Sequence, residues 1–82
     1  MRILYFSWLR ERIGVSSENF ETSSKNVIEL VRELRELDPK YAYVFKDLSS
    51  VKVAVDQELV NDFEASIIGA QEIAFFPPMT GG

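Results

Sequence analysis

The 82-residue sequence contains no cysteine and no histidine. Without cysteine the chain has no disulfide, no thiolate metal site and no cysteine nucleophile. Without histidine it lacks the usual general base near neutral pH and the commonest metal ligand in proteins. This composition is a poor basis for a self-contained enzyme, and we expect the chain itself to bind neither a metal nor a cofactor.

Long hydrophobic runs and runs of positive charge are also missing. The formal net charge is −4, with nine Lys and Arg residues against 13 Asp and Glu residues. A chain without a basic patch is an unfavourable partner for nucleic acid. The apolar stretch within MRILYFSWLRER is cut by Arg10, is too short to span a membrane and lacks a secretory cleavage site. We therefore expect a cytoplasmic protein that binds neither nucleic acid nor membrane.

The patterns that are present indicate one domain of the α+β class. The clearest element is a helix over residues 27–37, which Asn26 caps together with Glu29 three residues later. Its apolar residues recur at helical spacing and predict one buried stripe. The stripe consists of Val27, Leu30, Val31, Leu34 and Leu37.

Several shorter segments are typical of β-strands. Val51, Val53 and Val55 alternate with polar residues, as in a half-buried strand. The other strand candidates are residues 2–7, 17–22, 59–60 and 72–76. Residues 8–14 form one helical turn or a loop, and residues 41–48 favour a short helix or an irregular segment. The economical arrangement is one main helix packed on one face of a mixed sheet of four to five strands.

Side-chain alternation predicts what the free face of this sheet carries. Ile3, Tyr5, Ile73 and Phe75 would join the valines and the helix stripe in the core. The opposite face would carry Leu4, Phe6, Ala54, Ala74 and Phe76. Grouped apolar residues on a surface often mark where a partner docks, although single exposed apolar residues are normal. We interpret this group as a docking patch.

The last eight residues, FFPPMTGG, form an unusual end. From Ile73 to Gly82 there is no ionisable side chain. The prolines terminate the strand and stiffen its exit, and glycine without a Cβ enters slots that are too narrow for other residues. Such a tail presents a carboxylate on a thin stalk to another protein's active site, unless it is only an incidental flexible end. The stalk consists of Pro77, Pro78, Met79, Thr80, Gly81 and Gly82.

EIAFFPPMTGG resembles the C-terminal signature of the molybdopterin synthase small subunits, which are ubiquitin-like sulfur carriers. ILYFSWLRERIG is similar to the first strand and following turn of that family, and AVDQELV to the hairpin after its third strand. The resemblance implies a β-grasp (ubiquitin-like) fold for residues 1–82, with residues 77–82 as a projecting tail.

The resemblance also implies a function for this tail. An E1-like adenylyltransferase would consume ATP to adenylate the Gly82 carboxylate, and a sulfur donor protein would convert the product to a thiocarboxylate. The tail would then enter the large synthase subunit and donate sulfur to cyclic pyranopterin monophosphate, which builds the dithiolene of molybdopterin. The family's complex is a heterotetramer of two small and two large subunits.

The same resemblance assigns roles to individual residues. Gly82 would be the adenylate and thiocarboxylate site, with Gly81 beside it in the functional terminus. Arg10 would be a polar contact at the rim of the interface. The apolar contacts to the large subunit and the activating enzyme would be Phe6, Leu59 and Phe76.

Three other functions share parts of this pattern. Sulfur carriers for thiamine synthesis or transfer-RNA thiolation have the same fold and a Gly-Gly end, although the FFPP segment resembles the molybdopterin branch more closely. A ubiquitin-like protein modifier would join Gly82 to lysines of its targets through the same activated carboxylate. A plain interaction domain would have an incidental tail.

Overall fold

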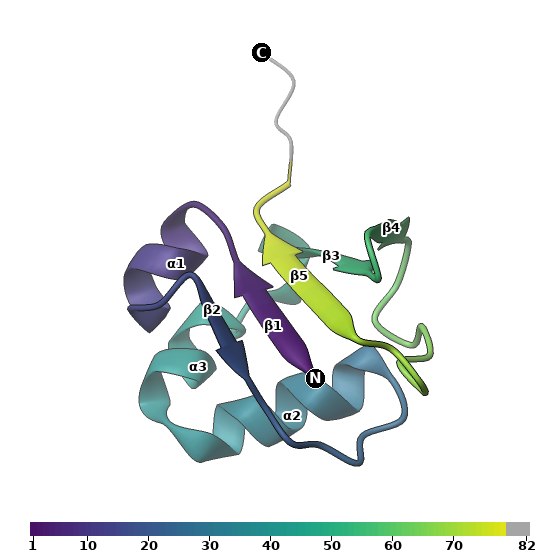
Figure 1. Cartoon of the computed structure of the whole chain (residues 1–82). Coiled ribbons are helices and arrows are strands. Elements are labelled where there is room, and N and C mark those ends of the chain that lie inside the picture. Colours follow the sequence, from purple (N-terminus) through teal and green to yellow (C-terminus); the bar gives the residue numbers. More distant parts are fainter. Residues whose placement is uncertain (79–82) are drawn as a thin grey trace.

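A five-stranded mixed sheet forms one layer of the computed structural model, and helices cover one of its faces (Figure 1). The structure describes residues 1–78, so the predicted tail positions Met79, Thr80, Gly81 and Gly82 lie outside the described residues. The elements are β1 (Arg2–Tyr5), α1 (Trp8–Ile13), β2 (Ser17–Asn19), α2 (Val27–Leu37), α3 (Pro39–Val44), the 3₁₀ helix η1 (Leu48–Ser50), β3 (Lys52–Val55), β4 (Glu58–Val60) and β5 (Glu72–Phe76).

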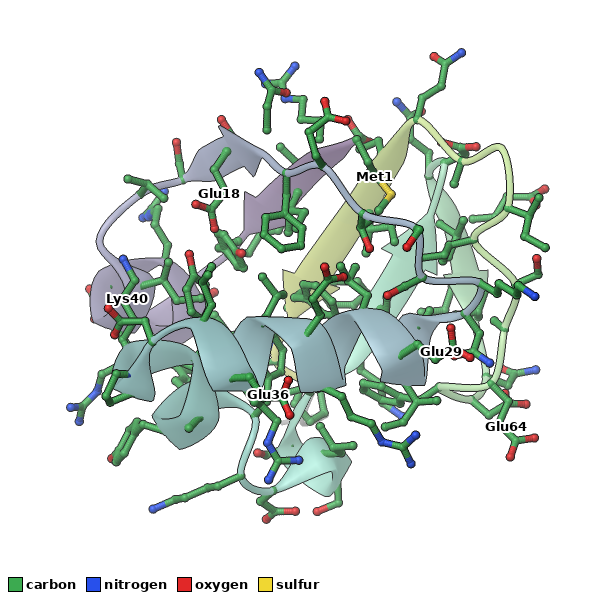
Figure 2. The ribbon with its side chains drawn as sticks, turned by 90° about the horizontal axis from the view of Figure 1, so that it is seen from below. Met1, Glu18, Glu29, Glu36, Lys40 and Glu64 are labelled. Atoms are coloured by element: carbon green, nitrogen blue, oxygen red, sulfur yellow. The ribbon has the colours of Figure 1, made fainter. Side chains whose placement is uncertain are left out.

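The strand order is β2-β1-β5-β3-β4, which places the last strand of the chain in the middle of the sheet. β5 runs parallel to β1 and antiparallel to β3, while the outer pairs β1–β2 and β3–β4 are antiparallel. Figure 2, seen from below, shows α2 running across the sheet. The predicted α+β class, mixed sheet and main helix are confirmed.

The main helix has the predicted bounds and cap. The side chain of Asn26 accepts a hydrogen bond from the amide of Glu29 at 3.0 Å. The Glu29 carboxylate in turn accepts from the amide of Lys25 at 2.9 Å, one residue before the position that a capping box uses. The first four residues of the predicted stripe are buried.

The fifth member of that stripe, Leu37, was wrongly assigned to the core. It is 60% exposed. Leu37 is the last residue of α2, and the chain leaves the helix at Asp38 in an extended conformation. The helical period places Leu37 on the same side of α2 as the buried stripe. The chain leaves this side at Asp38, and the Leu37 side chain therefore stays mostly exposed.

Strand alternation correctly predicted the two faces of the sheet. Ile3, Tyr5, Ile73 and Phe75 are buried, as are Val51 and Val53, and only Val55 is partly exposed. Phe75 lies among the core aromatics, with ring centroids 6.3 Å from Tyr5 and 4.9 Å from Phe45. The central strand β5 is therefore anchored in the core by its inward side chains.

Two short helices complete the core. Residues 8–14 contain the helix α1 (Trp8–Ile13), which ends where Gly14 adopts a left-handed conformation and donates its amide to the carbonyl oxygen of Arg10 at 2.8 Å. The sequence predicts a short helix within residues 41–48, but α3 begins two residues earlier, at Pro39. Proline is favoured at the first position of a helix, and Asp38 caps this one. These helices and the segments after them bury Leu9, Ile13, Tyr41, Val44 and Phe45.

The first two strands are shorter than predicted. β1 ends at Tyr5 instead of residue 7, because Ser7 has a positive φ of 55° that breaks the extended chain. β2 ends at Asn19 instead of residue 22. Phe6 therefore follows β1 instead of belonging to it.

A tyrosine–carboxylate network ties the edge strand β2 to the helical layer. Tyr5 and Tyr41 both donate hydrogen bonds to Oε2 of Glu18, which Figure 2 labels, at 2.6 and 2.7 Å. Burial, reinforced by the bond to Glu18, raises the pKa of Tyr5 far above its usual value. The same two causes raise the pKa of Tyr41 to about 12. Both hydroxyls therefore remain protonated donors at neutral pH.

Candidate functional site

The register of the sheet aligns apolar side chains in one row across its free face. Leu4 on β1 pairs with Ala74 on β5, Ala74 pairs with Ala54 on β3, and Ala54 pairs with Leu59 on β4. Directly paired residues project to the same side of a sheet, so these four side chains are neighbours. We call Leu4, Ala74, Ala54 and Leu59 the apolar row. Its predicted members Leu4, Ala54 and Ala74 are partly exposed, and Leu59 is 64% exposed.

The residues where β5 ends lie beside this row. Phe76, two positions after Ala74, is partly exposed and pairs with Lys52. Phe6 is 46% exposed, and its amide donates to the carbonyl of Phe75 at 3.1 Å. The contiguous apolar face predicted from alternation is thereby confirmed for the row, and Phe6 follows β1 beside it. Its role as a docking patch stays a prediction.

Three predicted contact residues line one shallow pocket of about 250 Å³. They are Leu59 from β4, Phe76 from β5 and Pro78 from the chain beyond β5. Pro77 lies between the last two and is partly exposed. Sequence reasoning placed Lys52 on the free face but missed its role in the wall of this pocket, together with Val60 and Asn61.

Arg10 lies apart from the apolar row. It is exposed on α1, whereas every member of the row belongs to the sheet. Its predicted role as a polar contact at the rim stays a prediction.

The strand that leads into the tail is held at both ends. At its start, Oδ1 of Asp56 accepts hydrogen bonds from the amides of Gln71 and Glu72, each at 2.9 Å. At its end the amide of Phe6 extends the pairing with Phe75. Because β5 is also bonded to strands on both sides, the direction in which the chain leaves the sheet at Pro77 is defined by the fold (Figure 1). We call Phe76, Pro77 and Pro78 the tail root.

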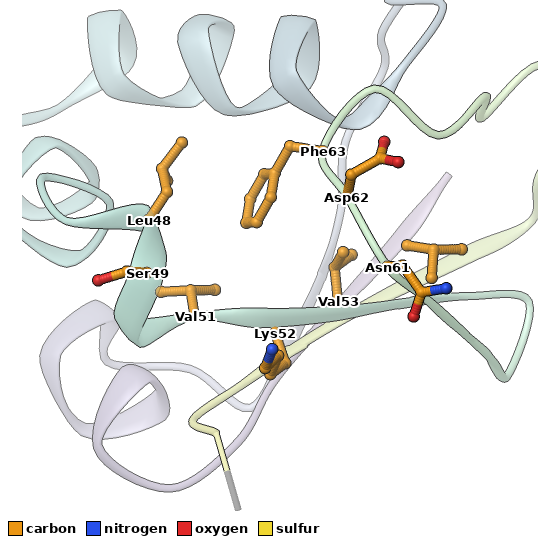
Figure 3. A pocket seen from close by; sticks show the side chains of 9 residues that line it. Leu48, Ser49, Val51, Lys52, Val53, Asn61, Asp62 and Phe63 are labelled. Atoms are coloured by element: carbon orange, nitrogen blue, oxygen red, sulfur yellow. The ribbon is translucent and has the colours of Figure 1, made fainter.

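A second pocket of about 230 Å³ is lined by η1 and β3 on one side and by the end of β4 and the segment after it on the other. Figure 3 shows Leu48 from η1 and Phe63 from the segment after β4 pointing into it, with Val53 on β3. Polar side chains, including Ser49 and Asp62, stand at its rim. The pocket has room for an apolar side chain, but its lining includes no hydroxyl–imidazole or thiol–imidazole pair.

Within residues 1–78 no three His, Cys, Asp or Glu side chains are grouped so that they could hold a metal ion. Nor is any helix of this part of the chain both long and apolar enough to cross a membrane.

Residues 3–82 match the ThiS family. The chain belongs to the ThiS family. A curated relative, the molybdopterin synthase sulfur carrier subunit of Haemophilus influenzae, is 36% identical over 83 residues, which cover 100% of this chain and 99% of the relative. The protein of the same name from Escherichia coli K12 is 29% identical over 82 residues, with the same two coverages. The resemblance to the molybdopterin synthase small subunits is thus confirmed.

The fold of this ThiS-family chain also has a solved counterpart. The crystal structure of SAMP1 from Haloferax volcanii matches with a TM-score of 0.72 and 26% identity, covering 100% of this chain and 98% of SAMP1. With the sheet order described above, this likeness confirms the expected β-grasp fold. Gly81 and Gly82 fall inside the family match but outside the described residues.

Proposed function

We propose that this chain is the sulfur carrier subunit of a molybdopterin synthase. The observation that carries the proposal is the apolar row, which crosses the strand that leads directly into the tail. A partner that covers the row also receives the tail, because both belong to β5. The two curated relatives, each matched over its whole length, carry this function in their names.

In this function the chain supplies only its terminal carboxylate. The Gly82 carboxylate attacks the α-phosphorus of ATP in an E1-like adenylyltransferase, and pyrophosphate leaves. Sulfur released by a donor protein at the oxidation level of hydrosulfide then attacks the acyl carbon and displaces AMP, and the thiocarboxylate is the product. The absence of cysteine and histidine from the chain is compatible with this passive role, because the catalytic groups belong to the partners.

The sulfur is then delivered inside the large synthase subunit. The free sheet face docks on that subunit, and the tail reaches cyclic pyranopterin monophosphate, where repeated transfer builds the dithiolene of molybdopterin. Apolar burial at Leu59 and Phe76 supplies affinity, while the fixed exit at Pro77 directs the tail. Two such chains and two large subunits form the expected heterotetramer. ATP is consumed by the activating enzyme and is not held by this chain.

A protein-modifier function is the second candidate, favoured by one observation. SAMP1, named a small archaeal modifier protein, shares the fold and 26% of the residues. A modifier uses the same adenylate, but a lysine amine of the target, instead of sulfur, attacks the Gly82 acyl carbon and AMP leaves. The two functions therefore diverge only after adenylation.

The experiment that tests the proposal is intact-mass analysis of the chain. The chain would be incubated with ATP, the activating enzyme and the sulfur donor of its own organism. Replacement of one oxygen by sulfur, localised to Gly82, is expected, and addition of the large subunit and cyclic pyranopterin monophosphate should yield molybdopterin. An unchanged mass under these conditions rejects the sulfur carrier. Conjugates of higher mass that disappear when Gly81 and Gly82 are deleted would establish the modifier instead.

A further inference from the structure

A groove of about 370 Å³ lies between the two short helices, away from the free sheet face. Trp8 and Arg12 of α1 form one part of its lining, and Tyr43 of α3 forms another. Lys46 and Asp47, from the segment between α3 and η1, also line it. None of these residues belongs to the apolar row or the tail root.

Two cations are held against one exposed aromatic ring in this groove. The guanidinium carbon of Arg12 lies 4.6 Å from the ring centroid of Tyr43, and Nζ of Lys46 lies 4.5 Å from the same centroid. Tyr43 is 45% exposed. Cation–π contacts restrain the two long side chains while their N–H groups stay available as donors. A ring already in contact with two cations offers little free face to an aromatic ligand, so the groove favours an anion.

The carboxylate of Asp47, the acidic group in the lining, is hydrogen-bonded within its own turn. Oδ1 of Asp47 accepts hydrogen bonds from the amide and the hydroxyl of Ser49, at 3.1 and 2.6 Å. These bonds lower the pKa of the Asp47 carboxyl. With Asp47 ionised, Arg12 and Lys46 still leave the lining one positive charge in excess, in a chain whose net charge is −4. The groove is therefore a local reversal of the overall charge.

The groove opens at the end of the sheet where the tail leaves. Tyr5 pairs with Phe75 and Lys52 pairs with Phe76, so β1 ends and β3 begins beside the tail root. Trp8 follows β1 by three residues and Ser50 precedes β3 by two, and both line the groove. Figure 1 shows α1 at the same end of the sheet as the exit of β5. The apolar row and the groove thus flank the tail root from the sheet side and the helix side.

We propose that this groove binds an acidic segment of the large synthase subunit, which accepts the tail. The inference rests on the proposed function, because it concerns the same tail-accepting partner. A planar guanidinium binds a carboxylate through two parallel hydrogen bonds, and the lysine adds a second charge-assisted bond. The partner then holds the chain on both sides of the tail root, by apolar contacts on the row and by ion pairs in the groove.

The test compares two double variants with equal changes in charge. Arg12→Gln/Lys46→Gln removes the groove cations, and Arg32→Gln/Arg35→Gln removes two exposed cations from α2 as the matched control. Each variant of the full chain is titrated with the activating enzyme and, separately, with the large synthase subunit, at low and at high salt. At low salt the groove variant should bind the large synthase subunit about tenfold more weakly, as expected for two partly desolvated ion pairs. Its affinity should also lose most of its salt dependence, while the control stays within twofold of the unaltered chain.

The possible outcomes separate the two proposals. If the unaltered chain binds neither enzyme, the proposed function fails. If it binds and the groove variant binds the large subunit as tightly as the unaltered chain does, only the groove inference is overturned. Sedimentation of the chain alone identifies the other occupant, since self-association that is lost in the groove variant would assign the groove to a second copy and overturn the inference. All four substituted side chains are exposed, and thermal unfolding checks that the variants remain folded.

Discussion

Lys52 on β3 lies directly opposite Phe76, the last residue of the strand that leads into the tail. Both residues line the pocket at the tail root, together with Leu59. The Lys52 amine thus stands beside the apolar side chains of Leu59 and Phe76, on the face that we propose as the docking surface. Apolar burial supplies most of the affinity of such a surface, whereas a single charge at its edge contributes to orientation and to the rate of association. In the proposed complex we therefore expect Phe76 to contribute to affinity and Lys52 to contribute to orientation.

The apolar row predicts a specific effect of substituting Leu59. Leu59 is 64% exposed in the row, and Leu37, at the end of α2, is 60% exposed outside it. Leu59→Asp should weaken binding to the large synthase subunit by about 1–3 kcal/mol, because a charge replaces a buried apolar contact. Leu37→Asp is the matched control and should leave the affinity unchanged. Titration calorimetry measures both affinities.

Each of these leucine variants should retain its stability within about 1 kcal/mol, since the side chains are exposed in the free chain. Thermal unfolding checks this. Equal weakening by the two substitutions would show that the chain's overall charge, and not the apolar row, determines the affinity.

The tyrosine network predicts a loss of stability at alkaline pH. In the unfolded chain Tyr41 ionises near its ordinary pKa of 10.0, whereas in the folded chain its pKa is about 12. A raised folded-state pKa stabilises the fold fully below pH 10, and this contribution is lost as the pH rises from about 10 to 12. Denaturant unfolding between pH 8 and 12 should show the decline, and Tyr41→Phe should flatten it. A profile that is identical in the variant would exclude Tyr41 as the titrating group, although Tyr5 would still contribute.

The same network predicts an order of effects at neutral pH. Tyr5→Phe and Tyr41→Phe each remove one donor to Glu18 Oε2. Each substitution should lower the free energy of unfolding by about 1–2 kcal/mol, since a hydrogen bond to a charged group is lost. The double variant should cost more than the sum of the two, because the partly buried carboxylate then loses both donors. Strict additivity would show that the two hydroxyls act independently.

The regular elements could be predicted from the sequence because their signals are local. Val51 and Val53 alternate into the core, and Asn26 marks the start of α2 three residues before Glu29. The end of α2 could not be read in the same way. Leu37 continues the apolar period, but whether it is covered depends on where the chain goes after Asp38, and this is a property of the tertiary structure.

The candidate site could be predicted only in part for a related reason. Alternation shows that Ala54 and Ala74 share a face, but not that Leu59 joins them, since this depends on the register of the β3–β4 hairpin. The groove was missed altogether. Its contacts join Arg12 and Tyr43, which are distant in the sequence and meet only because α1 and α3 pack together.

The hairpin between β3 and β4 offers a stabilising substitution. Its turn residues Asp56 and Gln57 have φ angles of 49° and 70°, in the left-handed region that favours glycine. Gln57→Gly should raise the free energy of unfolding by about 0.5–1 kcal/mol, because the removed strain exceeds the added entropy of the unfolded chain. Gly69→Ala is the opposite control, since Gly69 has a φ of 78° and an added Cβ would meet no atom within 4 Å. It should destabilise the chain through backbone strain alone, and denaturant unfolding measures both; stabilisation by both substitutions would contradict this account.

The tail predicts that function requires a free carboxylate at Gly82. A chain extended by a short peptide after Gly82 should unfold at the same temperature as the unaltered chain, because the core ends at Phe75. It should form no thiocarboxylate and support no molybdopterin synthesis, since the acyl carbon is then locked in a peptide bond. A protease that cuts after Gly82 supplies the matched control, because removal of the extension should restore both activities in the same sample. Molybdopterin synthesis by the intact extended chain would show that the terminal carboxylate is not the sulfur-bearing group, and the proposed function would then be wrong.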